Sequence, residues 1–269
     1  MYEVANAQWQ GCRDEQQDAG GFTDPEGPEV AHSGVLAVLA DGMGGLSHGA
    51  AAGRLTVRAF LDAYRRKAPG ESIPDALRRS LLATNKAVLD FARAKEGEGA
   101  AAATIVAAVL KENQLFWIAA GDSRAYLVRN GVALRLTVDH TVAEDALDAA
   151  DTLSHDIDPE AVSSFMGSPE APRMDTNHQA LRLASGDCVL LATDGLYWTL
   201  SEEEIGKVIR GDDLREDCER LVRCVEERQA EDQDNVTVLM MRYSNENKVE
   251  RPGFWTGALA TLLRRPGRS

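Results

Sequence analysis

Four aspartates each stand where a strand-like apolar run meets a turn, and this placement constrains the fold more than any other feature. Asp41, Asp122 and Asp194 follow the runs 35–40, 116–121 and 188–193, and Asp234 comes just before the run 236–241. A strand that begins beside antiparallel neighbours starts at the rim where they finish. All four carboxylates can therefore share one rim, an arrangement suited to holding divalent metal ions.

The composition indicates a soluble enzyme. The chain has 269 residues and 44% hydrophobic content, which is enough to bury a substantial core. The net charge of -14 argues against a nucleic-acid or anionic-membrane binder, because such partners require a basic face. A phosphate-bearing substrate remains compatible with this charge if a bound metal inverts the local field.

The N-terminus and the cysteines bear on location. No basic region followed by an apolar stretch opens the chain, so no signal peptide is visible and a cytoplasmic location is expected. The cysteines at positions 12, 188, 218 and 224 form no close metal-type pair. We interpret them as inert thiols of a reducing compartment.

Helices and strands are expected in blocks rather than in strict βαβ alternation. Apolar periodicity predicts helices over 50–67, 74–95 and around 214–225, and Ser201 with Glu204 predicts a capping box. Residues 104–137 read as a strand meander, with strands at 104–110, 114–120 and 125–128, a turn at 111–113 and another at Asn130-Gly131. We therefore expect an α/β (α+β) fold, a four-layer αββα sandwich with two mainly antiparallel sheets flanked by helix pairs.

Two segments do not fit this core. Residues 144–160 are rich in Asp, Glu, Ala and Ser, so we interpret about 141–178 as an acidic flap, with a solvated surface helix as the alternative. The flap predicts a preference for substrates with basic flanks. The basic amphipathic tail, residues 244–269 beyond a domain at 1–243, is too short to span a bilayer. Packing on its own domain and docking to a partner or membrane both remain open for the tail.

Six short motifs resemble the ordered motif set of the metal-dependent (PPM, type 2C) serine/threonine protein phosphatases of bacterial type. Any one of them is weak, because Asp-Gly turns are common, but six in family order are specific. The resemblance covers roughly residues 5–243. The motifs are RDEQQDA at 13–19, DGMGG at 41–45, GDSR at 121–124, TVDH at 137–140, TDGL at 193–196 and DNVT at 234–237.

The resemblance implies a site for two Mn²⁺ or Mg²⁺ ions. In the family pattern Asp41 is the bridging carboxylate and the carbonyl of Gly42 is a ligand of one metal. Asp194 and Asp234 would hold the other metal, and Asp18 would orient water in that shell. Hard divalent ions of this kind prefer oxygen ligands. Taken singly, each aspartate could instead cap a turn or lie on the surface.

The resemblance also implies how phosphate is held and cleaved. Arg13 matches the family's phosphate clamp, and a planar bidentate donor suits a tetrahedral dianion. A water or hydroxide bridging the metals would attack phosphorus directly, without a phospho-enzyme. Asp122 matches a position that helps to bind a weaker third metal in some members, although it could also brace Arg124. Asp139 and His140 are expected to anchor the flap rather than to do chemistry.

Three positions depart from the family pattern. Gln16 stands where Asn is usual, and this change affects how the Arg13 loop is held. Met43 replaces the His proposed as general acid in some members, so the leaving group would take its proton from metal-bound water. Trp198 replaces a carboxylate, which weakens the expectation of a third metal.

The function expected from these residues is hydrolysis of phosphoserine and phosphothreonine in proteins, opposing a cognate Ser/Thr kinase. A phosphatase-like module that binds phosphoproteins without turnover is an alternative, and loss of a ligand aspartate would have signalled it. A hydrolase of small phosphate esters is a third possibility, because its metal centre would look the same.

Overall fold

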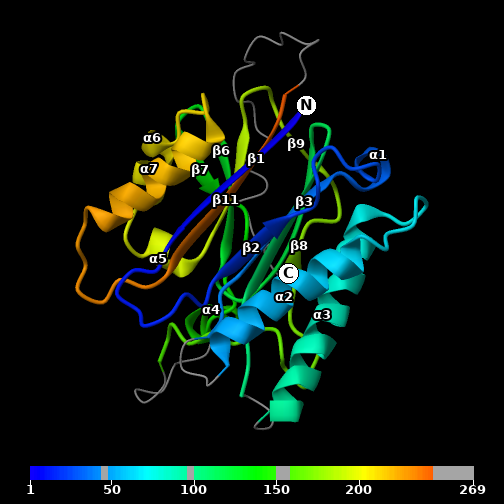
Figure 1. Ribbon diagram of the computed structural model, residues 1–269, viewed down its shortest axis with the longest axis vertical. Coiled ribbons are helices and arrows are strands. Elements are labelled where there is room, and N and C mark those ends of the chain that lie inside the picture. The colour runs from blue at the N-terminus through cyan, green and yellow to red at the C-terminus, as the bar shows by residue number, and fades with distance from the viewer. Residues whose placement is uncertain (44–47, 96–99, 150–157, 245–269) are drawn as a thin grey trace.

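The chain folds into two β-sheets packed face to face, with helices over both outer surfaces (Figure 1). The computed structural model describes residues 1–43, 48–95, 100–149 and 158–244. The first sheet, in spatial order, consists of β1 (Tyr2–Trp9), β11 (Val236–Tyr243), β10 (Cys188–Ala192), β6 (Arg124–Arg129) and β7 (Val132–Arg135). The second consists of β2 (Ala19–Phe22), β3 (Val35–Ala40), β4 (Ile105–Lys111), β5 (Gln114–Ala120) and β8 (Asp175–Thr176), and β9 (Leu181–Arg182) also pairs with β5.

Two helix pairs cover the outer faces. Helices α2 (Gly49–Tyr64) and α3 (Ile73–Lys95) pack on the second sheet, while α6 (Glu202–Val208) and α7 (Leu214–Glu226) pack on the first. The neighbouring strands pair antiparallel throughout both sheets. The predicted four-layer αββα sandwich is confirmed. Shorter helices occur at α1 (Val30–Ser33), α4 (Val142–Ala149) and α5 (Asp194–Tyr197).

The core has three apolar layers, one between the sheets and one under each helix pair. The central strand β3 is buried at every position, because one of its faces meets α2 and α3 while the other meets the first sheet. Its sequence is accordingly a continuous apolar run instead of an alternating one. The strands that carry the aspartates are thus held rigidly on both sides.

The helix predictions are confirmed with small shifts in their ends. Helix α2 ends at Tyr64, three residues before the predicted end at Lys67, and α3 begins one residue early at Ile73. The capping box at α6 is present: Ser201 accepts a hydrogen bond from the Glu204 N–H, and the Glu204 side chain accepts one from the Ser201 N–H. The four cysteines form no disulfide in the described residues, and two of them are buried.

Several predicted segments are described only in part. Helix α4 opens the predicted flap, and the chain from 158 to 178 is mostly irregular before and after β8, whereas 150–157 lie outside the described residues. The predicted tail from 245 onward also lies outside them, so the domain boundary at 243 stays a prediction. Within the described residues no helix is long and apolar enough to cross a membrane.

Candidate active site

The strand directions bring the four aspartates to one edge of the sandwich. Strands β3 and β5 are both antiparallel to β4, so they run the same way, and Asp41 and Asp122 follow their ends at the same edge. Strand β10 ends beside the starts of β6 and β11, which places Asp194 and Asp234 there as well. Asp18 precedes β2, whose first residue pairs with the last residue of β3.

The carboxylates at this edge resist ionisation. Burial raises the pKa of Asp18 to about 6, against a hydrogen bond that the Thr193 hydroxyl donates to its Oδ2 at 2.9 Å. Burial, followed by the negative charge of Asp122, raises the pKa of Asp194 to about 8. Burial and then the charges of Asp18 and Asp194 raise the pKa of Asp41 well above its ordinary value. A bound cation would favour the ionised carboxylates by offsetting both their burial and their mutual repulsion.

The donor set fits a hard divalent cation. Oδ1 of Asp18 and Oδ1 of Asp194 are buried, and neither has a hydrogen-bond partner among the described residues. Oxygen donors of this kind are those that Mg²⁺ and Mn²⁺ prefer. No group of three or more His, Cys, Asp or Glu side chains in the described part of the chain encloses a metal by itself. Backbone oxygen and water would therefore have to complete the coordination, as is usual for Mg²⁺.

Gly42 is packed too tightly for any side chain. A Cβ atom there would lie 2.2 Å from the carbonyl oxygen of Gly49 and 2.8 Å from that of Gln17. Its N–H donates to the Gln17 carbonyl at 3.2 Å, which joins the turn after β3 to the loop before β2. This close approach agrees with the expected backbone role of Gly42, whereas Gly44 and Gly45 of the same motif lie outside the described residues.

Arg13 lies across the carboxylate of Asp234. Its Nε donates to Oδ1 at 2.9 Å and its Nη2 donates to Oδ2 at 2.7 Å, and the arginine side chain remains 57% exposed. The expected phosphate clamp is therefore at the site, paired with one of the expected metal ligands. Gly11 permits this approach, since its φ is +64° and a Cβ there would lie 2.4 Å from the Asp234 carbonyl oxygen.

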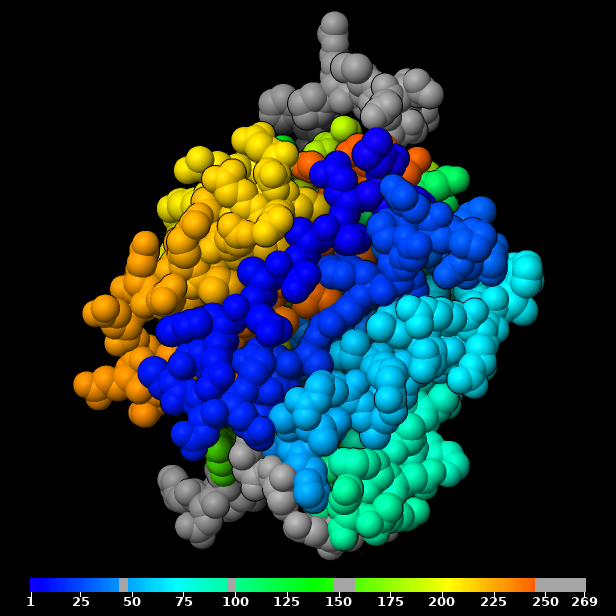
Figure 2. Space-filling view, viewed as in Figure 1, coloured from blue at the N-terminus to red at the C-terminus, as the bar shows by residue number. Residues whose placement is uncertain are grey.

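Asn235 holds the Arg13 loop in place. Its Oδ1 accepts from the Gln17 N–H at 2.7 Å, and its Nδ2 donates to the carbonyls of Gln10 at 2.7 Å and Glu15 at 3.2 Å. Figure 2 shows the N-terminal segment, in dark blue, against the orange segment that precedes β11. The departure at Gln16 is accommodated by a hydrogen bond from its Nε2 to Thr237 Oγ1 at 3.1 Å. The motif DNVT thus supplies a scaffold for the loop as well as a carboxylate.

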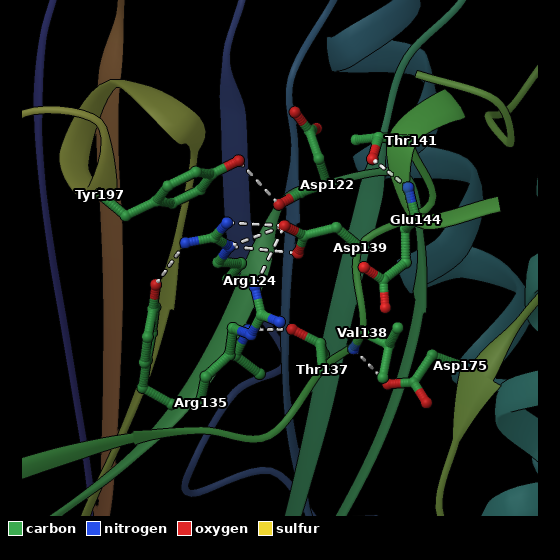
Figure 3. Close-up of polar contacts among 12 residues, drawn as sticks. Asp122, Arg124, Arg135, Thr137, Val138, Asp139, Thr141, Glu144, Asp175 and Tyr197 are labelled. Atoms are coloured by element: carbon green, nitrogen blue, oxygen red, sulfur yellow. Dashed lines mark hydrogen bonds and ion pairs between the residues drawn. The ribbon is translucent and has the colours of Figure 1, made fainter. Parts of the chain in front are cut away.

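Asp122 sits above a network centred on Arg124 (Figure 3). The Arg124 guanidinium donates to the Asp139 carboxylate, with Nη2 2.6 Å from Oδ2, and stacks 3.5 Å from the centre of the Tyr197 ring. The Tyr197 hydroxyl donates to the Asp122 carbonyl at 3.0 Å, while the Asp122 side chain points away from Arg124. Asp139 therefore braces Arg124, and His140 accepts a hydrogen bond from the Gly121 N–H through Nδ1 at 3.2 Å.

Sequence reasoning missed Tyr197 as part of the site. The residue lies three positions after Asp194, one helical turn on, so α5 ties Asp194 to the Arg124 network. A cavity of about 460 Å³ opens beside α5, and its lining includes Arg13, Asp194, Trp198 and Asp234. The departure at Trp198 consequently places an aromatic ring next to the carboxylates.

Comparison with known proteins identifies the family. A family model described as protein phosphatase 2C matches residues 15–237. The chain belongs to the protein phosphatase 2C family. The matched range contains every candidate carboxylate and leaves only Arg13, among the expected site residues, just outside its start.

Curated relatives and solved structures match most of the chain, and the solved structures share its fold. The serine/threonine phosphatase stp of Listeria monocytogenes is 26% identical over 212 residues, covering 77% of this chain and 83% of its own length. The solved structure of PppA from Pseudomonas aeruginosa is 30% identical with a TM-score of 0.71, and the match covers 90% of this chain and 97% of that one. A PstP catalytic domain in complex with two manganese ions is 25% identical with a TM-score of 0.68, covering 89% and 97%. The resemblance inferred from the six motifs is confirmed at the level of the family.

Proposed function

We propose that this type 2C family member is a metal-dependent protein phosphatase that hydrolyses phosphoserine and phosphothreonine. The observation that carries the proposal is the convergence of four aspartates, with two unpartnered buried carboxylate oxygens, beside the exposed arginine of the first motif. Phosphate-ester hydrolysis needs cationic groups around the phosphoryl oxygens and an in-line nucleophile. The aspartates of the site offer ligands for metal cations, and the cavity beside them leaves room for the nucleophile.

In this proposal each residue has a distinct task. Asp41, with the Gly42 carbonyl, and the pair Asp194 and Asp234 would hold two divalent ions, Mn²⁺ or Mg²⁺. When bound, such ions supply an activated water and balance the charge of the phosphoryl group. Asp18 would orient water in that shell, because its Oδ2 is already fixed by Thr193 while its Oδ1 is free among the described residues.

Arg13 would bind the phosphate of the substrate. Its side chain is more than half exposed and already donates through two nitrogens to one carboxylate, so the same fork can engage two phosphoryl oxygens. For this the guanidinium would move from Asp234 to the phosphate, which frees the Asp234 carboxylate for metal. The role of Asp122 in a third metal site remains part of the proposal, with Tyr197 holding its backbone.

Phosphorylated proteins are the proposed substrates, and a Ser/Thr kinase that produces them is the proposed counterpart. A cytoplasmic location agrees with these assignments and stays a prediction. The choice between peptide and small-ester substrates is decided by comparing turnover of a phosphothreonine peptide with that of a nucleotide.

The deciding experiment measures phosphothreonine-peptide hydrolysis as Mn²⁺ and Mg²⁺ are titrated, for the parent, Asp194→Asn and Asp90→Asn. Asp90 is a matched control, since it pairs with Lys86 on the exposed face of α3 and its side chain is 54% exposed. We expect metal-dependent turnover in the parent and the control, and its loss in Asp194→Asn.

A second readout uses thermal unfolding of the same three proteins. Metal that binds only the folded state raises the melting temperature, so Mn²⁺ should stabilise the parent and the control more than Asp194→Asn. Absence of turnover in a parent that Mn²⁺ does stabilise would contradict the phosphatase proposal while retaining the metal site.

A further inference from the structure

The cavity beside the carboxylates has a second wall that the phosphatase chemistry does not require. One wall consists of Arg13, Asp194 and Asp234, which the proposed function already uses. The remaining lining residues include Trp198 and Asp232, which we call the second wall. A peptide whose phosphate contacts Arg13 can place a neighbouring side chain against Trp198 or Asp232, because all three residues line the same cavity.

Trp198 presents its ring to solvent from a fixed backbone. Its N–H donates to the Asp194 carbonyl at 2.9 Å, and the next residue, Thr199, bonds through its hydroxyl to Gln233 Oε1 at 2.7 Å. Trp198 is nevertheless 63% exposed, more than any other Trp, Tyr or Phe in the described part of the chain. A large ring in this position offers a flat apolar face to a ligand at little entropic cost.

Asp232 supplies an available negative charge beside that ring. Its side chain is exposed and makes no hydrogen bond or ion pair with the described residues, although its charge contributes a small part of the rise in the Arg13 pKa. Asp234 in the same cavity is instead paired with Arg13 through both carboxylate oxygens. Gln233 between them cannot bind a ligand readily, because its Nε2 donates to the Gly195 carbonyl and its Oε1 accepts from Thr199. The second wall therefore combines one open aromatic face with one open carboxylate.

We propose that Trp198 and Asp232 form a subsite that binds a lysine or arginine side chain of the substrate beside the phosphorylated residue. The inference rests on the proposed phosphatase function, and it names the substrate class for that site. A cation is attracted to an aromatic face and to a carboxylate at once, whereas an acidic side chain is repelled by Asp232 and by the net charge of -14. A purely apolar side chain would contact the Trp198 ring only, and the Asp232 carboxylate would not contribute to its binding.

The expected size of the preference follows from these two contacts. An exposed cation–π contact and a surface ion pair each change affinity by a small factor, so we expect kcat/KM to favour a basic flank by roughly 3- to 10-fold. Because the Asp232 contact is exposed, the preference should weaken as salt is raised from 20 to about 500 mM.

The test compares phosphothreonine peptides that differ only at the residues flanking the phosphothreonine, with arginine, glutamine, leucine or glutamate there. The quantity measured is the ratio of kcat/KM values within each protein, for the parent, Trp198→Ala, Trp198→Phe and Asp232→Asn. We expect the arginine-to-glutamine ratio to fall close to one in Trp198→Ala, to be partly retained in Trp198→Phe, and to fall together with its salt dependence in Asp232→Asn. Urea unfolding of each variant establishes that it is folded.

Two matched controls lie at the opposite end of the strands. Val132 begins β7 and is 57% exposed, and Glu26 is an exposed carboxylate in the loop between β2 and α1. Val132→Ala and Glu26→Gln should keep the parent's ratio.

Equal kcat/KM for all flanks in the parent would overturn the subsite while leaving the phosphatase function intact. A preference for leucine over arginine that Trp198→Ala removes would overturn the cationic specificity. A parent that hydrolyses none of the peptides would overturn the proposed function together with the subsite.

Discussion

Arg124 and Asp139 should be energetically coupled to each other far more strongly than the two residues of a surface ion pair. Nε of Arg124 lies 3.1 Å from both carboxylate oxygens of Asp139 and Nη2 lies 2.6 Å from Oδ2, and the two side chains are only 19% and 13% exposed. Breaking a fully buried pair costs about 3–5 kcal/mol, and an exposed pair contributes about 0–1 kcal/mol. Asp139 keeps a second partner in Arg135, whose Nη1 lies at 3.2 Å.

The magnitude for this pair therefore falls between those limits. We expect Arg124→Met to lower the free energy of unfolding by about 2–3 kcal/mol, since it leaves Asp139 partly unpaired and removes the stacking on Tyr197. The coupling energy from the cycle Arg124→Met, Asp139→Asn and the double variant should be about 1–2 kcal/mol, because the stacking is not shared with Asp139.

Urea unfolding of the four proteins measures the coupling directly. The matched control is the cycle on Lys86 and Asp90, a pair with 75% and 54% exposed side chains, for which we expect about 0.5 kcal/mol or less. If the Arg124–Asp139 coupling is no larger than that of the control, the network does not stabilise the loop that carries Asp122, and the reasoning from burial and geometry is wrong.

Two further predictions concern His140 and Arg129. Burial, followed by the charge of Arg173, lowers the pKa of His140 below 6.5, against the opposing charges of Asp145 and Asp139. As pH falls below 6.5 the histidine therefore binds a proton more readily in the unfolded chain than in the folded one, and the free energy of unfolding decreases. Urea midpoints between pH 7.5 and 5 should therefore fall less in His140→Asn than in the parent, and parallel slopes would refute this. Arg129→Met should lower the free energy of unfolding by about 3–5 kcal/mol in the same assay, because the Asp187 side chain, which is 2% exposed, loses its paired guanidinium. The control Arg65→Met, at a half-exposed pair with Asp62, should change it by about 0.5 kcal/mol or less.

The sequence was most informative where the chain is buried on two sides. The run 114–120 was predicted as a strand and is β5 with the same ends, because its apolar residues are flanked by a turn and a glycine. Strand β2 was not predicted, since two of its four residues are glycine and its strand character comes from pairing with β3. Strand β1 alternates too loosely in polarity to stand out and is fixed by its pairing with β11.

In the candidate site, too, the sequence predicted where the backbone places residues but not which side chains pair. Position at a strand end was enough to predict that Asp41, Asp122, Asp194 and Asp234 share a rim, because antiparallel topology determines that geometry. The pairing of Arg13 with Asp234 and the stacking of Arg124 on a tyrosine depend on side-chain conformation across 221 positions in one case and 73 in the other. Local sequence carries no signal for such contacts, and the motifs alone could not supply them.

The pairing of β1 with β11 has a consequence for synthesis of the chain. Tyr2 lies opposite Tyr243 and Trp9 opposite Val236, so β1 must wait until the last described strand has been synthesised before it can enter a sheet. Closing so long a loop makes this a late event in folding. The Arg13 loop depends on Asn235 as well, so the site is completed only when nearly the whole domain has been translated. A nascent or truncated chain would therefore carry most of the core without a working active site.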